Sequence, residues 1–247
     1  MVEGGKIDWA CHDNDAAAAI GDTIEFDDAV SVAFKFAEKH PNDVLIVVTG
    51  DHETGMLSVG SPGTGDHIYL EMLSNQKGSK DAFVALTEKF IKEHKEDAAF
   101  VQFKPVIEEK CGLRFNERGR WGRGGMVPGE NEIKALEDAF AVSKKAILEN
   151  HREGKDRFAR TLIRLLNSAA GISWGSGGHS ALPVNTSAWG NQAQQIAQNI
   201  RDNTDIAKQL KQTVSRLPVQ NSAQTLRPAN VGAFLLFGAG AVHYQRL

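Results

Sequence analysis

One apolar run that is followed at once by two ligand-type side chains most restricts how this chain can fold. Residues 44–49 read Val-Leu-Ile-Val-Val-Thr without polar alternation, and Gly50, Asp51 and His52 follow directly. A continuous apolar run of this length is typical of a strand buried on both faces, as in parallel sheets covered by helices. Open α/β sheets place their ligand sites at the carboxyl ends of such strands. Because the pleat has ended there, Asp51 and His52 can converge on one ligand.

The first twelve residues, Met-Val-Glu-Gly-Gly-Lys-Ile-Asp-Trp-Ala-Cys-His, hold further ligand-type side chains at Glu3, Asp8 and His12. Asp8 and His12 are four positions apart, so on a helix they share one face and can bind one ion. Oxygen and imidazole ligands suit zinc and magnesium better than soft metals. Each fragment alone also fits a solvated helix face or a capped turn. Taken together, the two fragments indicate a metal-dependent hydrolase.

Three blocks of the chain resemble the metal-site blocks of alkaline phosphatases and occur in the same order. They are residues 1–12, residues 45–55 (Leu-Ile-Val-Val-Thr-Gly-Asp-His-Glu-Thr-Gly) and residues 177–184 (Gly-Gly-His-Ser-Ala-Leu-Pro-Val). The resemblance covers residues 1–60 and 171–210, whereas the middle of the chain matches only loosely. It implies an α/β fold with a mostly parallel sheet flanked by helices, and the hydrolysis of phosphomonoesters.

The resemblance also implies two zinc (Zn²⁺) sites and one magnesium (Mg²⁺) site. Glu3 matches the magnesium ligand, Asp8, His12 and His179 match the ligands of one zinc, and Asp51 and His52 match ligands of the second. In such sites one zinc activates a water molecule and the other holds a serine alkoxide, so that a phosphoserine forms and is then hydrolysed. The glycine-rich approach to His179 lets the backbone pass close to a metal.

The family's nucleophilic serine has no counterpart that we can identify in these 247 residues. In the family it lies in an Asp-Ser-Ala block before the magnesium glutamate, together with a phosphate-binding arginine. We therefore assign no catalytic residue, and we expect the chain to be the carboxyl-terminal half of such an enzyme, a partial domain that binds metal without turnover. The alternatives are a related phosphodiesterase, sulfatase or phosphomutase, against which the Val-Glu-Gly-Gly block argues, and a non-catalytic metal-binding fragment.

Periodicity and turn signals predict four parts of the chain. Residues 1–60 are an α/β core with an amphipathic helix over 23–40. Residues 61–170 are a largely helical insertion, which is either accessory or at a subunit interface. Apolar positions mark its helices in 83–91, 133–147 and 158–166. Residues 171–217 return to the core with His179. Residues 218–247 are a linker and an apolar tail. The tail is too short to span a bilayer. We expect it to be a strand or a buried tail, or else a degenerate sorting or anchor segment.

Charge and cysteine content restrict the function further. The net charge of −3 gives no electrostatic case for nucleic-acid binding, and the arginine- and glycine-rich segment 115–125 is expected to be a surface loop. Cys11 and Cys111 form one disulfide or none. The expected binding partners are small phosphomonoester substrates, and a homodimer is one of the oligomeric states that the sequence allows. The resemblance implies a periplasmic or extracellular location. His67 and His151 are kept as outside candidates for water-bridged contacts to a metal or phosphate.

Overall fold

The computed structural model describes residues 1–61, 63–123, 125–199, 202–215 and 232–238. Contacts divide the chain into two compact units: unit 1 comprises Met1–Asp8, Gly21–Glu53 and Ser180–Leu247, and unit 2 comprises Trp9–Ile20 and Thr54–His179. Helices α1 (Gly5–His12) and α2 (Ala16–Glu38) each continue across this division.

Unit 1 contains a four-stranded sheet of order β1-β10-β2-β9. The strands are β1 (Val2–Gly4), β2 (Val44–Thr49), β9 (Thr186–Gly190) and β10 (Gly232–Gly238). Strand β10 is parallel to both β1 and β2, whereas β9 is antiparallel to β2. The prediction of a mostly parallel sheet is therefore not confirmed for the molecule as a whole, since this sheet is mixed and the small sheets of unit 2 are antiparallel.

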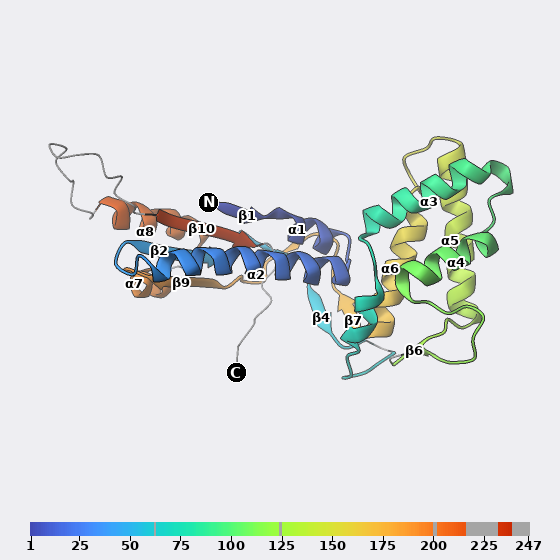
Figure 1. Cartoon of the computed structure of the whole chain (residues 1–247), viewed down its shortest axis with the longest axis horizontal. Coiled ribbons are helices and arrows are strands. Elements are labelled where there is room, and N and C mark those ends of the chain that lie inside the picture. Colours follow the sequence, from blue (N-terminus) through green and yellow to red (C-terminus); the bar gives the residue numbers. More distant parts are fainter. Residues whose placement is uncertain (62, 124, 200–201, 216–231, 239–247) are drawn as a thin grey trace. The chain divides into compact units, whose positions relative to one another are not determined.

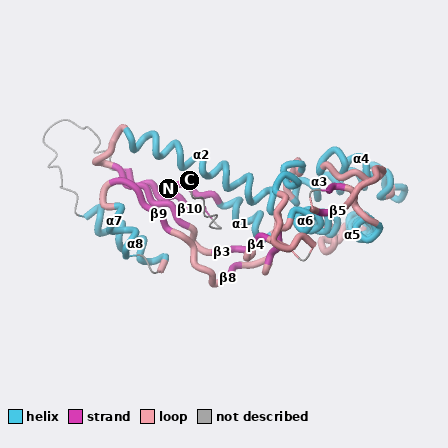
Figure 2. Tube along the Cα trace, turned by 90° about the horizontal axis from the view of Figure 1, so that it is seen from below, coloured by secondary structure: helices cyan, strands magenta, loops and turns pink. Residues whose placement is uncertain are grey.

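Strand β2 is buried on both faces, and its side chains alternate between two apolar clusters. Val44 and Ile46 pack with Ala33 and Ala37 of α2. Leu45 and Val47 pack on the other face, with Ile196 of α7 (Ala193–Asn199) and Ile206 of α8 (Asn203–Ser215). Figure 2 shows α2 along one side of these strands and α7 and α8 along the other. Helices on both faces leave no solvated side, which explains why the strand has no polar alternation.

Unit 2 is mainly helical. Its helices α3 (Lys80–His94), α4 (Phe100–Cys111), α5 (Glu130–Leu148) and α6 (Arg157–Ala170) lie together in Figure 1 and enclose a cluster rich in phenylalanine. The three helices predicted from apolar spacing correspond to α3, α5 and α6. Helix α4 is absent from the prediction, because Pro105 in its interior is a residue that normally ends a helix.

Short strands complete the fold. In unit 2, β4 (Leu57–Val59) pairs with β7 (Ile172–Trp174), and β5 (Trp121–Gly122) pairs with β6 (Gly125–Met126). Strand β3 (Glu53–Thr54) pairs with β8 (His179–Ser180), and a 3-10 helix covers Leu70–Asn75. The segment 115–125, expected to be a surface loop, thus contains part of a hairpin. The expected linker 218–230 lies outside the described residues, whereas β10 occupies part of the apolar tail.

Among the described residues, no helix has the length and apolar character that crossing a membrane would require.

The buried carboxylate of Asp15 ties together the first turns of two helices in unit 2. Its Oδ1 accepts hydrogen bonds from the Ala18 N–H at 3.1 Å and from Gln76 Nε2 at 2.8 Å, and its Oδ2 accepts from the Lys80 N–H at 2.8 Å. It is therefore the N-cap of α2, which begins earlier than the predicted residue 23, and it also holds the start of α3. Burial raises the pKa of Asp15, although these hydrogen bonds oppose the shift.

Replacement of Asp15 by alanine removes the acceptor for two backbone N–H groups and one amide. We expect Asp15→Ala to lower the free energy of unfolding by about 2–4 kcal/mol, measured by urea denaturation at neutral pH. Asp27→Ala, at an exposed position of α2, serves as the control and is expected to change stability by less than about 0.5 kcal/mol. Equal stability of the two variants would contradict this assignment.

Both cysteines are buried, and neither forms a disulfide. Cys111 lies in the phenylalanine-rich cluster of unit 2, and burial raises its pKa to about 12. A thiol with this pKa is almost entirely protonated at pH 8, and the thiolate is the reactive form.

We expect Cys111 in a Cys11→Ser variant to resist a thiol reagent such as DTNB at pH 8 while the protein is folded. The same thiol should react fully once guanidinium unfolds the chain, without any reductant. Fast labelling of the folded variant would show that the thiol is accessible and contradict the packing.

Candidate metal centre

Helix α1 presents two of the predicted ligands on one side. Its buried positions, Ile7, Ala10 and Cys11, are spaced as one face of a helix. Asp8 and His12, four residues apart, are half-buried beside that face. The buried face anchors the helix, so the carboxylate and the imidazole are held at the edge of the packed region, where an ion can reach them.

Two further ligand-type residues follow strand β2 where its burial ends. Thr49 and Gly50 are buried, whereas Asp51 is exposed and His52 is half-buried. Asp51 Oδ2 lies 3.3 Å from His52 Nε2. The two successive side chains therefore come together instead of lying on opposite faces, as expected where the pleat has ended.

His12 and His179 form a close pair of imidazoles in unit 2. Their Nε2 atoms are 3.1 Å apart. His12 Nδ1 lies 2.8 Å from the carbonyl oxygen of Gly177, which can only accept a hydrogen bond. His12 Nδ1 therefore carries a proton, and in the neutral ring Nε2 is left with the lone pair that a metal requires.

Backbone hydrogen bonds fix the loop that leads to His179. The Gly55 N–H donates to the Gly178 carbonyl, and the Gly55 carbonyl accepts from the N–H groups of Gly175 and Ser176. Gly55 has a φ of +91°, and a Cβ atom there would lie 2.6 Å from the Trp174 ring. Only glycine fits this left-handed, crowded position. The Gly at the end of Gly-Asp-His-Glu-Thr-Gly thus serves to dock the loop.

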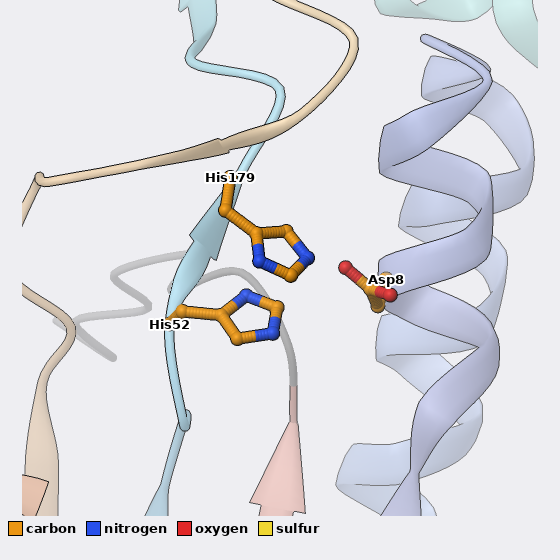
Figure 3. Close-up of side chains that lie close together, drawn as sticks. All are labelled: Asp8, His52 and His179. Carbon is orange, nitrogen blue, oxygen red and sulfur yellow. The ribbon is translucent and has the colours of Figure 1, made fainter.

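Asp8, His52 and His179 each offer a ligand atom, and these atoms all lie within 4.8 Å of one another. Figure 3 shows the three side chains directed toward a common point. One carboxylate and two imidazoles are a donor set that zinc favours, and two imidazole nitrogens bound to one tetrahedral zinc lie about 3.3 Å apart. The 3.1 Å between His12 Nε2 and His179 Nε2 is close to that separation. The residues present therefore fit a zinc ion.

The remaining predicted and candidate residues lie as follows. His179 Nε2 lies beside His12 Nε2, and the resemblance assigns these two residues to the same zinc ion. Glu3 is exposed on β1 and is not part of the described three-residue group. His67 and His151 are exposed beside Asp66 and Glu149 respectively and also lie outside it. Cys11 is buried, in keeping with a neighbour of the ligands.

A model of the family described as alkaline phosphatase matches residues 1–215 of the 247. The chain belongs to the alkaline phosphatase family. It is 32% identical over 210 residues to alkaline phosphatase 3 of Bacillus subtilis, an alignment that covers 84% of this chain and 38% of that protein. It is 27% identical over 200 residues to the repressible alkaline phosphatase of Saccharomyces cerevisiae, covering 78% of this chain and 31% of that protein.

Solved structures of alkaline phosphatases share the fold. A cold-active alkaline phosphatase from Shewanella sp. superposes with a TM-score of 0.66 at 24% identity, over 86% of this chain and 44% of that one. The enzyme from Thermus thermophilus gives a TM-score of 0.56 at 22% identity, over 85% and 41% of the two chains. This alkaline phosphatase-family chain thus spans less than half the length of the relatives that it matches.

Sequence reasoning missed two residues that support the centre. Asn14 Nδ2 donates to the Cys11 carbonyl at 3.0 Å and to the Ser176 carbonyl at 2.7 Å, which ties the end of α1 to the His179 loop. Its φ of 53° is left-handed, so an asparagine just past a helix was an available signal. Glu53 accepts a hydrogen bond from Ser180 Oγ, next to His179. No local spacing predicts that long-range contact.

Removal of one imidazole tests the centre. We expect His179→Ala to weaken zinc binding by at least about 100-fold, because the ion would lose a direct ligand whereas even an indirect supporting partner contributes 10–100-fold. Zinc affinity would be measured by competition with a chromophoric chelator. His94→Ala is the matched control, since His94 is exposed and its Nδ1 contacts the Phe90 carbonyl within its own helix, outside the group of proposed ligands. Unchanged affinity in His179→Ala would exclude His179 as a ligand.

Proposed function

We propose that the whole protein hydrolyses phosphomonoesters at a metal centre to which this chain contributes Glu3, Asp8, His12, Asp51, His52 and His179. The observation that carries the proposal is the His12–His179 pair, whose Nε2 atoms are 3.1 Å apart in a chain of the alkaline phosphatase family. The activity is proposed for the whole protein, because the chain spans less than half the length of its relatives.

The proposed cofactors are two Zn²⁺ ions and one Mg²⁺ ion. When bound, such ions act as Lewis acids that stabilise charge on phosphoryl oxygens and lower the pKa of water. Asp8, His12, His52 and His179 would hold zinc, with Asp51 beside His52, and Glu3 would hold magnesium. The carboxylates of Asp8 and Asp51 would offset part of the charge of the ions, which neutral imidazoles cannot do.

The chain's own residues position the ligands before any ion binds. The Gly177 carbonyl orients the His12 ring and selects the tautomer in which Nε2 carries the lone pair that a metal ligand requires. The hydroxyls nearest His179 serve the loop: Ser176 Oγ donates to the Gly178 carbonyl at 2.8 Å, and Ser180 Oγ donates to Glu53. Neither serine is therefore our choice of nucleophile. The proposed phosphoserine forms on a serine that we do not assign within residues 1–247.

Other features of the proposal come from the family alone. The substrates are small phosphomonoesters, the location is the periplasm or cell surface, and a homodimer remains open. We also propose that residues 61–170 are an accessory insertion in a core formed by residues 1–60 and 171–217.

The purified 247-residue chain provides the first test. We expect it to bind zinc, measured by elemental analysis after gel filtration, and to show no turnover of p-nitrophenyl phosphate with added zinc and magnesium, because it offers ligands without an assigned nucleophile. Turnover that is lost in His179→Ala would show that this chain holds a nucleophile, and the absence of bound zinc would contradict the ligand set.

The whole protein separates the phosphomonoesterase from its alternatives. We expect p-nitrophenyl phosphate to be hydrolysed in preference to bis(p-nitrophenyl) phosphate and p-nitrophenyl sulfate. His179→Ala should lower kcat/KM by about 100-fold or more, as expected for loss of a metal ligand, whereas His94→Ala should not. A preference for the diester or the sulfate would replace the proposed function by a phosphodiesterase or a sulfatase.

A further inference from the structure

A cavity of about 460 Å³ lies within unit 2 beside helix α6, and none of the proposed metal ligands lines it. Its polar lining includes Arg157, Arg160, Arg164, Asn167, Asn14 and Trp174. This volume falls in the range of sites for small molecules. The cavity therefore has the size and the polar groups of a binding site that the proposed hydrolysis does not use.

Buried polar atoms on two of the residues that line the cavity have no hydrogen-bond partner among the described protein atoms. They are Asn167 Oδ1 and Trp174 Nε1. Asn167 is only 3% exposed, and its Nδ2 donates to the Asn14 carbonyl at 2.5 Å, which fixes Oδ1 as the free end of the amide. Buried polar atoms are nearly always paired. Asn167 Oδ1 requires a donor and Trp174 Nε1 requires an acceptor, and a hydroxyl group can be either.

The cavity also carries positive charge that the surrounding protein does not neutralise. Arg160 pairs with Asp156, with 2.5 Å between Nε and Oδ2. Asp13, the carboxylate in the lining, pairs with Lys80 Nζ at 2.8 Å and lies 3.7 Å from Arg160. Arg157 and Arg164 make no ion pair with a described carboxylate.

Arg157 and Arg164 share one face of α6, with Thr161 between them, and they border both this cavity and a smaller adjoining hollow. The adjoining hollow contains Asp138, whose carboxylate is already paired with Lys134 at 3.2 Å. The two guanidinium groups are thus available to an external anion. Guanidinium groups bind phosphate through parallel, charge-assisted hydrogen bonds.

We propose that this cavity binds a small hydroxylated phosphate ester, such as a phosphorylated polyol. Its phosphate lies against Arg157 and Arg164, and its hydroxyl groups donate to Asn167 Oδ1 and accept from Trp174 Nε1. A dianionic phosphate balances the two unpaired cations, and the hydroxyls satisfy the two unpaired buried atoms. The site binds this ligand without transforming it, and it does not depend on the metal centre or on the proposed hydrolysis.

Isothermal titration of the 247-residue chain in EDTA tests the proposal, because chelation prevents phosphate from binding through metals. The probes are glycerol 3-phosphate, inorganic phosphate and glycerol. We expect glycerol 3-phosphate to bind about tenfold more tightly than inorganic phosphate, since two neutral hydrogen bonds contribute on this order. Glycerol alone should give no binding. The absence of binding by either phosphate would overturn the proposal and leave water as the occupant of the cavity.

Two variants separate the two halves of the recognition. Arg164→Gln should weaken both phosphates by about tenfold or more, as for the loss of a charge-assisted hydrogen bond. Trp174→Phe keeps the ring but removes the N–H, so it should weaken glycerol 3-phosphate and leave inorganic phosphate unchanged. Arg152→Gln, an exposed arginine outside the lining, is the matched control. Circular dichroism checks folding, and if Trp174→Phe is unfolded, Arg164→Gln decides alone. Equal affinities in Arg164→Gln and the unaltered chain would refute the site.

Discussion

Burial of strand β2 on both faces is the constraint on which unit 1 depends. Ile46 and Val47 are 1% and 0% exposed and point to opposite faces, so helices must cover both sides. Burying each such side chain stabilises the fold by about 1.5–3 kcal/mol, whereas a partly exposed polar contact such as that between Asp51 and His52 contributes only about 0–1 kcal/mol. The strand therefore positions the ligands, and the ligands do little to hold the strand. Polar ligands can therefore appear only from Asp51 onward, the first exposed position after the strand.

The placement of His179 depends on backbone geometry. Gly55 makes three backbone hydrogen bonds to the loop 175–178, and the side chains of His12 and Asn14 contact the carbonyls of Gly177 and Ser176. Each neutral hydrogen bond contributes only about 1 kcal/mol, but together they define one path for the loop. The imidazoles of His12 and His179 are thereby brought together by the fold alone. Because the two rings are already ordered, metal binding loses less conformational entropy, which is the advantage of a preorganised site.

Local patterns in the sequence predict much of this arrangement, and the failures have physical causes. The run 44–49 predicts a strand covered on both faces, and the four-residue spacing of Asp8 and His12 predicts a shared helix face. The mixed sheet could not be predicted, because the direction of β9 follows from pairing between residues that are far apart in sequence, such as Val47 and Ala188. The role of Gly55 could not be predicted either, because it is the Trp174 ring that leaves no room for a side chain at this position. The arginines of α6 stand in an ordinary amphipathic pattern that gives no sign of a cavity.

The turn after α1 serves both the metal centre and the arginine-lined cavity. His12 contacts His179, whereas the next two residues, Asp13 and Asn14, line the cavity. The left-handed backbone of Asn14 reverses the chain after the helix. The Asn14 carbonyl accepts a hydrogen bond from Asn167, whose Oδ1 has no partner in the described part of the chain, and the Asn14 side chain donates to the Ser176 carbonyl next to Gly177. Asn14 therefore connects a residue of the cavity lining to the loop that carries His179. The two sites share no proposed ligand residue, but one residue, Asn14, is bonded toward both.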